Sequence, residues 1–146
     1  MNYTAAQVQA VLGIGQETLR YWRRTLSPLA RESGKFSFSD LVALRVVLHL
    51  TRAGFAIGSV CPFAEELFAA CSVGAIEAAN DDLMLVIHPE SGKVRRVNGT
   101  AALSTEFAIL LPISALVSQL LECLGAPSTA PQLSLALPLT AVGGRP

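Results

Sequence analysis

The feature that most constrains the fold is a pair of glycines, Gly13 and Gly15, which interrupts a chain with helical spacing on both sides. A glycine after an apolar periodic stretch often ends a helix, and a second glycine close by lets the chain turn sharply. The sequence therefore predicts two short helices joined by a tight turn, with Ile14 in the angle between them.

The first of these helices is expected over residues 5–12. Thr4 precedes it, and Gln7 follows three residues later, which is the spacing of a capping box. Val8 and Leu12 are four residues apart and so lie on one face of this helix, which faces the core.

The second helix is expected over residues 16–25, with Leu19 and Trp22 facing inward and Ser27–Pro28 ending it. Its other side chains carry amide, hydroxyl and guanidinium groups, which suit base edges and phosphates. We interpret it as a DNA-reading element, and a merely solvated charged face is the alternative. The candidate DNA contacts here are Gln16, Glu17, Thr18, Arg20, Tyr21, Arg23 and Arg24.

A polar loop follows and is interpreted as a wing, a small hairpin whose tip lies along the DNA backbone. It spans residues 29–37 and supplies two further candidate DNA contacts, Arg31 and Lys35. Ser39 is expected to cap the next helix, over residues 40–52. A further helix should end near Ser72.

The hydrophobic period then changes from helical to β. A short apolar run, 82–88, and a second β-prone run, 93–98, flank a turn signal and predict a β-hairpin, and a third strand is expected at about 106–110. A last helix should begin at Pro112 and end near Leu124. Its wide apolar face, either a dimer interface or only domain core, comprises Ile113, Leu116, Val117, Leu120, Leu121 and Leu124.

These signals predict a mainly α, α+β chain. We expect a winged helix-turn-helix over residues 1–72, an α+β dimerisation module over 73–125 and a proline-rich tail over 126–146. Of the residues, 51% are hydrophobic and only 15% are charged, which is more apolar surface than a small monomer readily buries. The composition therefore favours a homodimer.

Charge is distributed unevenly, although the formal net charge is zero. Residues 1–54 hold seven basic and three acidic side chains, whereas the rest of the chain holds four basic and eight acidic ones. A basic N-terminal part suits contact with phosphates, and an acidic C-terminal part argues against DNA wrapping around the whole molecule. Double-stranded DNA is the partner that this pattern favours.

Several other classes of function are disfavoured. The apolar run 107–121 is too short for a membrane span and contains Pro112, and the first residues lack a signal peptide, so a cytoplasmic protein is expected. The cysteines Cys61, Cys71 and Cys123 lack the spacing of a metal site. No catalytic set of residues is recognisable, so we expect neither an enzyme, nor a metal, nor a cofactor.

The N-terminal residues resemble the winged helix-turn-helix of MerR-type transcription regulators over about residues 2–60. The residues that carry the resemblance are Tyr3–Thr4 with Val8, Gly13–Ile14, Glu17–Trp22, Phe38–Leu41 with Leu44, and Ala53–Ile57. The resemblance implies a DNA-binding protein that acts as a dimer on a roughly palindromic site, with the second helix in the major groove and the wing on flanking phosphates.

By position, this resemblance makes Thr18, Arg20 and Tyr21 DNA contacts and places Arg23 or Arg24 near the backbone. Residues 73–146 lack the sustained heptads of the family's usual coiled coil. No small-molecule effector can be inferred. Two alternatives stay open: an architectural DNA-binding protein of a mobile element, such as an excisionase or small packaging subunit, and a protein-interaction module.

Overall fold

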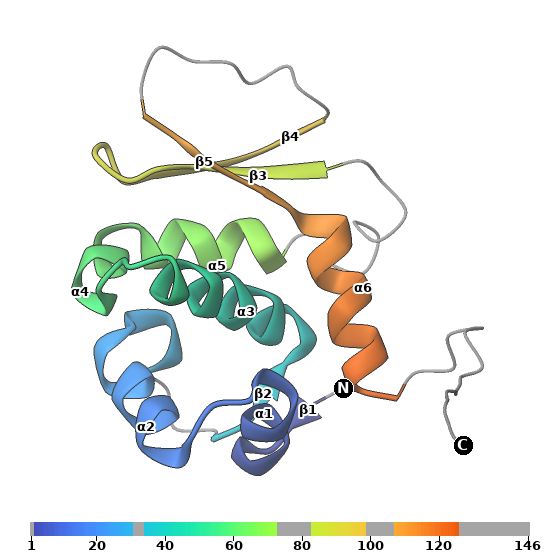
Figure 1. The fold of residues 1–146 in the computed structure, drawn as a ribbon. Helices are drawn as coiled ribbons and strands as arrows, with labels where there is room; N and C mark the ends of the chain where they lie inside the picture. Colours follow the sequence, from blue (N-terminus) through green and yellow to red (C-terminus); the bar gives the residue numbers. More distant parts are fainter. Residues whose placement is uncertain (1, 31–33, 73–82, 99–106, 126–146) are drawn as a thin grey trace, which may run out of the picture.

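The computed structural model describes residues 2–30, 34–72, 83–98 and 107–125. Helices make up most of the N-terminal part, and a small sheet with one further helix makes up the C-terminal part (Figure 1). The predicted class, mainly α with α+β character, is confirmed. The proline-rich tail lies outside the described residues.

The first two helices have the predicted bounds. Helix α1 spans Ala5–Leu12 and begins with the predicted capping box, in which the Gln7 N–H donates to the Thr4 hydroxyl and the Thr4 N–H donates to the Gln7 side chain. Gly13 ends it with φ of 69°, a left-handed conformation that favours glycine. Helix α2 spans Gln16–Thr25.

The segment between α2 and the next long helix differs from the predicted wing. A short 3-10 helix, η1, spans Ser27–Leu29, and strand β2 spans Phe36–Ser37. Strand β2 pairs antiparallel with β1, Asn2–Tyr3, at the start of the chain. Within the described residues, β2 thus pairs with the N-terminal strand β1. It does not pair with another strand in the described part of the 29–37 segment, as the predicted hairpin would require.

Helix α3 spans Phe38–Arg52 and begins two residues earlier than predicted. Its N-cap is Ser37 and not Ser39, because only Ser37 has an acidic residue three positions later. The Asp40 N–H donates to the Ser37 hydroxyl at 3.1 Å, and the Ser37 N–H donates to the Asp40 carboxylate at 2.9 Å.

The predicted helix ending near Ser72 is divided at its proline. Helix α4, Ile57–Val60, is followed by the 3-10 helix η2, Cys61–Phe63, and by helix α5, Ala64–Ser72. Pro62 lies within η2, where the missing N–H is tolerated at the start of a new helical segment.

The C-terminal sheet has the order β4-β3-β5, and both pairings are antiparallel. Strands β3, Leu83–His88, and β4, Lys93–Asn98, form the predicted hairpin. Strand β5 spans Ile109–Pro112, three residues later than predicted at its start, because its register is set by pairing with β3. Helix α6, Ile113–Cys123, follows directly.

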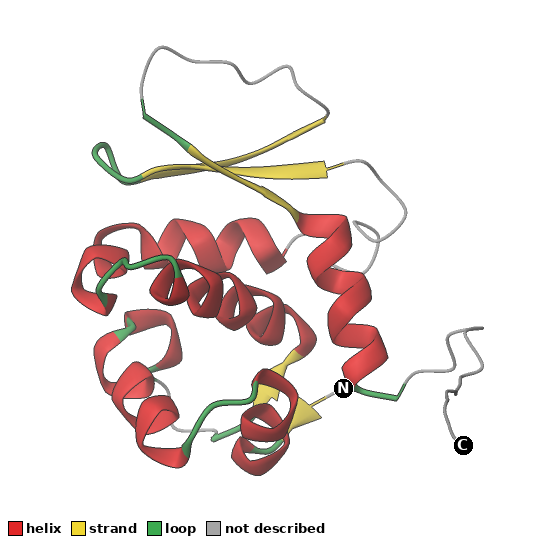
Figure 2. Cartoon of the chain, in the orientation of Figure 1, coloured by secondary structure: helices red, strands yellow, loops and turns green. Residues whose placement is uncertain are grey.

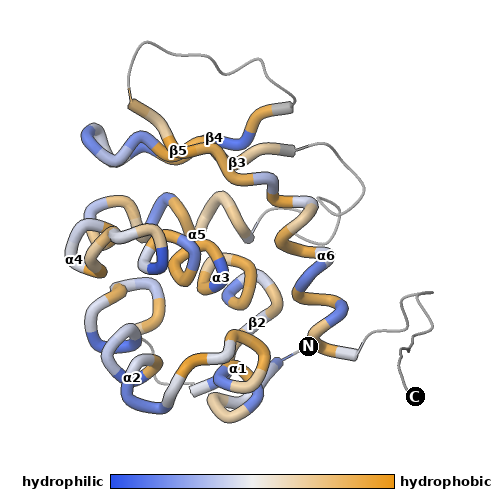
Figure 3. Tube along the Cα trace, viewed as in Figure 1, coloured by the Kyte–Doolittle hydropathy of each residue, from blue (hydrophilic) through white to orange (hydrophobic). Residues whose placement is uncertain are grey.

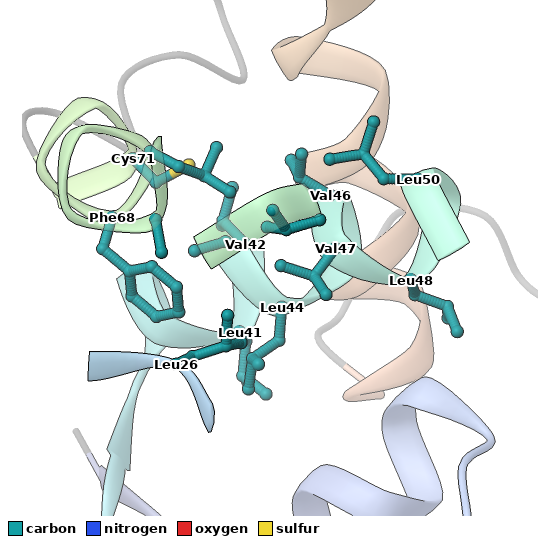
Figure 4. Close-up of a cluster of buried hydrophobic side chains, with 14 of the residues drawn as sticks. Leu26, Leu41, Val42, Leu44, Val46, Val47, Leu48, Leu50, Phe68 and Cys71 are labelled. Carbon is teal, nitrogen blue, oxygen red and sulfur yellow. The ribbon is translucent and has the colours of Figure 1, made fainter. Parts of the chain in front are cut away.

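The molecule has three layers (Figures 1 and 2): the sheet, then α3 and α5, then α1 and α2 on the far side from the sheet. Helix α3 lies at the centre, and nine of its 15 residues are buried. A helix that is apolar around most of its circumference is expected between two layers. Figure 4 shows the α3 side chains that pack with Leu26, Phe68 and Cys71.

The core is continuous from the N-terminal helices to the sheet. A single cluster of buried residues includes Val8 and Trp22 of the first two helices, Ile87 of β3 and Leu120 of α6. The sheet and α6 thus pack on the helix-turn-helix. No helix in the described ranges is long and apolar enough to cross a membrane.

Candidate nucleic-acid interface

Helix α2 turns a polar face to solvent and an apolar face to the core. Leu19 and Trp22 are 2% and 4% exposed, as the helical spacing predicts, whereas Tyr21 is 47% exposed. Figure 3 shows hydrophilic residues along α2, on the opposite side of the molecule from the hydrophobic strands β3 and β5. The predicted residues Gln16, Glu17, Thr18, Arg20, Tyr21 and Arg24 are all exposed, and Arg23 is half-buried.

An ion pair orders the first turn of this polar face. The Arg20 Nη1 lies 2.6 Å from the Glu17 Oε1, and both side chains are exposed to solvent. Exposed pairs of this kind contribute little to stability, at most about 1 kcal/mol. The Arg20 guanidinium nevertheless lies beside the Glu17 carboxylate, and a phosphate would have to compete with this carboxylate for it.

Arg23 is held by an aromatic ring from another element. Its guanidinium carbon lies 5.5 Å from the centre of the Phe36 ring on β2, a cation–π distance. Phe36 is itself buried, at 2% exposure, so the ring is a rigid support. This contact joins α2 to the strand that follows the wing loop, and no local pattern in the sequence indicates it because the two residues lie in different elements.

The C-terminal end of α2 is attached to the helices beneath it. The Ser27 hydroxyl donates to the Glu65 carboxylate of α5 at 2.7 Å, and the Cys61 thiol donates to the Thr25 carbonyl oxygen at 3.5 Å. These contacts set the angle at which α2 projects from the core. Glu65 is far from Ser27 in the chain, so no local signal in the sequence identifies the two as partners.

The wing contributes less of the described surface. Lys35 is exposed and immediately precedes β2, whose first residue, Phe36, supports Arg23. Arg31 lies outside the described residues. The structure thus brings the predicted α2 residues together on one exposed face of the helix. Lys35 lies next to β2, the strand whose Phe36 contacts Arg23 of α2.

Two titratable side chains outside this face, Cys71 and His49, have pKa values shifted by burial. Burial raises the pKa of the Cys71 thiol to about 12, so this cysteine is a neutral core side chain. Burial, with the nearby charges of Arg45 and Arg52, lowers the pKa of His49 on α3. No group of three histidine, cysteine or acidic side chains that could hold a metal ion occurs in the described ranges.

The residues expected at a dimer interface lie mostly inside the chain. Ile113, Leu116, Val117 and Leu120 of α6 are at most 4% exposed and belong to the core that includes α3. Leu121 and Leu124 are half-buried and pack against the same core. The apolar face of α6 therefore packs against its own chain. Its four buried residues, Ile113, Leu116, Val117 and Leu120, are not available for contact with a second copy of the chain.

The two helices α1 and α2, joined by the turn at Gly13–Gly15, and the exposed polar face of α2 are those of a helix-turn-helix domain. Residues 3–62 match the family model described as the MerR HTH family regulatory protein, so this part of the chain is similar to a MerR-type helix-turn-helix. The family comprises DNA-binding transcription regulators, and the predicted resemblance is confirmed over these residues. No curated protein matches the chain.

Proposed function

We propose that this protein is a sequence-specific transcription regulator that binds a palindromic DNA operator as a homodimer, with α2 in the major groove. The observation that carries the proposal is the face of α2, where amide, hydroxyl, phenol and guanidinium groups are exposed together. Such groups read base edges and bind phosphates, and a major groove accommodates one α-helix.

The roles follow from position along α2. Gln16 and Thr18 occupy the first half of the helix, which in helix-turn-helix proteins contacts base edges, and Tyr21 follows one turn after them on the same exposed face. Arg23 and Arg24 occupy its last turn and bind phosphates, together with Lys35 and Arg31 of the wing loop. Glu17 holds Arg20 at the groove until DNA displaces it.

Two-fold symmetry in the operator follows from two-fold symmetry in the protein. Dimeric helix-turn-helix proteins bind half-sites about one helical turn apart, roughly 34–36 Å between centres. A homodimer is supported by the hydrophobic content of 51% and by the exposed apolar side chains Phe107 and Leu110.

The test begins with selection of bound fragments from a pool of random double-stranded DNA by the full chain. An enriched inverted repeat, bound by two copies of the chain, is the expected result. Gln16→Ala combined with Tyr21→Ala should then weaken binding to the selected site by roughly 10- to 100-fold, because a good base contact discriminates by about 1–3 kcal/mol.

Ser118→Ala, an exposed substitution on α6, is the matched control and should leave binding unchanged. If the double variant bound the selected site as tightly as this control, α2 would not be the reading element. Enrichment of no sequence would point to an architectural role, and the absence of DNA binding to a protein-interaction module.

A further inference from the structure

The two edges of the C-terminal sheet differ in charge. Edge strand β4 carries three basic residues, Lys93, Arg95 and Arg96, whereas residues 107–112, which include edge strand β5, carry no charge at all. Charged side chains on an edge strand prevent it from pairing with another chain. One edge of this sheet is therefore protected and the other is not.

The β4 edge is also occupied by a side chain of the same molecule. The Val94 N–H donates to the Glu66 Oε2 of α5 at 3.0 Å, so this peptide group points away from β3 and is already satisfied. An acidic residue thus closes part of the β4 edge, and α5 packs beneath it.

The same hydrogen bond determines which peptide groups β5 exposes. Because the Val94 N–H points outward, Val94 and its partner Ile87 are a pair without mutual hydrogen bonds, and the peptide groups of Ile87 face β5. The partner of Ile87 on that side, Ile109, then bonds to β3, and the next residue, Leu110, directs its N–H and C=O to the outer edge.

The side chains beside these groups are apolar and exposed. Leu110 is 42% exposed and Phe107 is 59% exposed, and the third large exposed hydrophobic residue in the described ranges is Tyr21 on the proposed DNA-reading face. No strand in the described part of the chain pairs with the outer edge of β5. Unpaired peptide groups and exposed apolar side chains thus coincide at one strand.

We infer that β5 pairs antiparallel with β5 of a second copy of this chain, which joins the two sheets into one of six strands. This inference rests on the proposed homodimer and names its interface. An uncharged edge is complementary to itself, whereas two β4 edges would bring like charges together. The occupant that the charge pattern favours is therefore an identical β5 edge, with Leu110 and Phe107 covered in the contact.

This pairing is compatible with binding to one DNA duplex. An antiparallel strand pair has its two-fold axis perpendicular to the sheet, so the helix-covered faces of both sheets lie on the same side. In each copy α2 lies beyond α3 and α5 on that side (Figure 1). Both reading helices thus project from the same side of the joined sheet.

The test compares two lysine substitutions in the full chain by sedimentation equilibrium without DNA. Leu110→Lys places like charges across the joined edges and should raise the dimer dissociation constant by roughly 100-fold. Val97→Lys, on the same outer face but on β4, is the matched control and should leave a dimer of twice the 15.4 kDa chain mass. Circular dichroism checks that both variants are folded.

A second variant acts through the main chain. Leu110→Pro removes the N–H that points outward and no hydrogen bond to β3, since proline is tolerated at such edge positions. Both Leu110 variants should be folded monomers. A wild-type monomer, or a dimer that persists in both variants, would overturn the inference, as would a dimer lost only on deletion of residues 126–146. Because fluorescence anisotropy separately measures DNA binding, a dimer that binds no DNA refutes only the proposed function.

Discussion

The role of α2 in phosphate binding can be tested by one substitution, Arg24→Ala. Arg24 is exposed in the last turn of α2, and its side chain supports no buried contact. Its removal should therefore change the free energy of unfolding by less than about 0.5 kcal/mol. If the guanidinium binds a phosphate, the variant should instead lose affinity for DNA in a salt-dependent way.

The size of the effect follows from counterion release. Each neutralised phosphate contributes about 0.9 to the slope of log affinity against log salt concentration, and a dimer with two copies of Arg24 would lose about 1.8. Between about 50 mM and about 200 mM salt, the wild-type affinity should fall roughly 12-fold more than the affinity of the variant. Fluorescence anisotropy of a labelled operator at several salt concentrations measures both slopes.

Arg95→Ala is the matched control, because it removes the same charge from an exposed site on β4, on the other side of the molecule from α2. Its slope should equal that of the wild type. Equal slopes for the two variants would mean that only net charge matters and that Arg24 contacts no phosphate. A lower melting temperature for Arg24→Ala alone would show that the residue is structural.

Three further predictions concern the fold. Ser37→Ala should lower the free energy of unfolding by about 1 kcal/mol in urea titrations, because it removes half of the capping box with Asp40. The pKa of His49 is lowered in the folded state, so the unfolded chain binds more protons as the pH falls below 6.5. The free energy of unfolding should therefore decrease below this pH, and His49→Gln should make that decrease smaller. Cys71, with a pKa of about 12, should react with a thiol reagent at pH 8 only after unfolding, whereas exposed Cys123 reacts at once, and equal rates would contradict the burial.

The parts of the fold predicted correctly from sequence are those with strong local signals. Helices α1 and α2 have their predicted bounds because Thr4, Gln7 and Gly13 act on the backbone within a few residues of themselves. The hairpin of β3 and β4 was likewise predictable, since a turn signal separates two β-prone runs of strand length.

Where several local signals compete, the sequence alone does not determine at which residue a helix or strand begins. Ser37 and Ser39 are both plausible caps for α3, and the hydrogen bond to Asp40 decides between them. The run from Phe107 to Val117 is almost entirely apolar, so only the register with β3 determines where β5 begins.

The candidate interface residues likewise divide into those that a local pattern predicts and those that depend on contacts between distant elements. Helical period predicts which side chains of α2 face outward, because their exposure depends only on the direction of the core. The support of Arg23 by Phe36 and the burial of Leu116 against the chain's own helices depend on contacts between distant elements. Periodicity identifies an apolar face but cannot determine whether the same chain or a second copy covers it.

The central position of α3 leads to a last prediction about the operator. Helix α3 packs against α1 on one side and against α5 and α6 on the other, and its buried residues form one cluster with those of the sheet. If two copies join through β5, the distance and rotation between the two α2 helices are fixed by packed layers and not by a flexible linker. Insertion of about 5 base pairs between the half-sites rotates one of them by about half a turn of DNA and should abolish binding of the dimer to both. Gel-shift assays with operators of increasing spacing measure this directly, and equal affinity at all spacings would show that the reading helices are not rigidly coupled through the sheet.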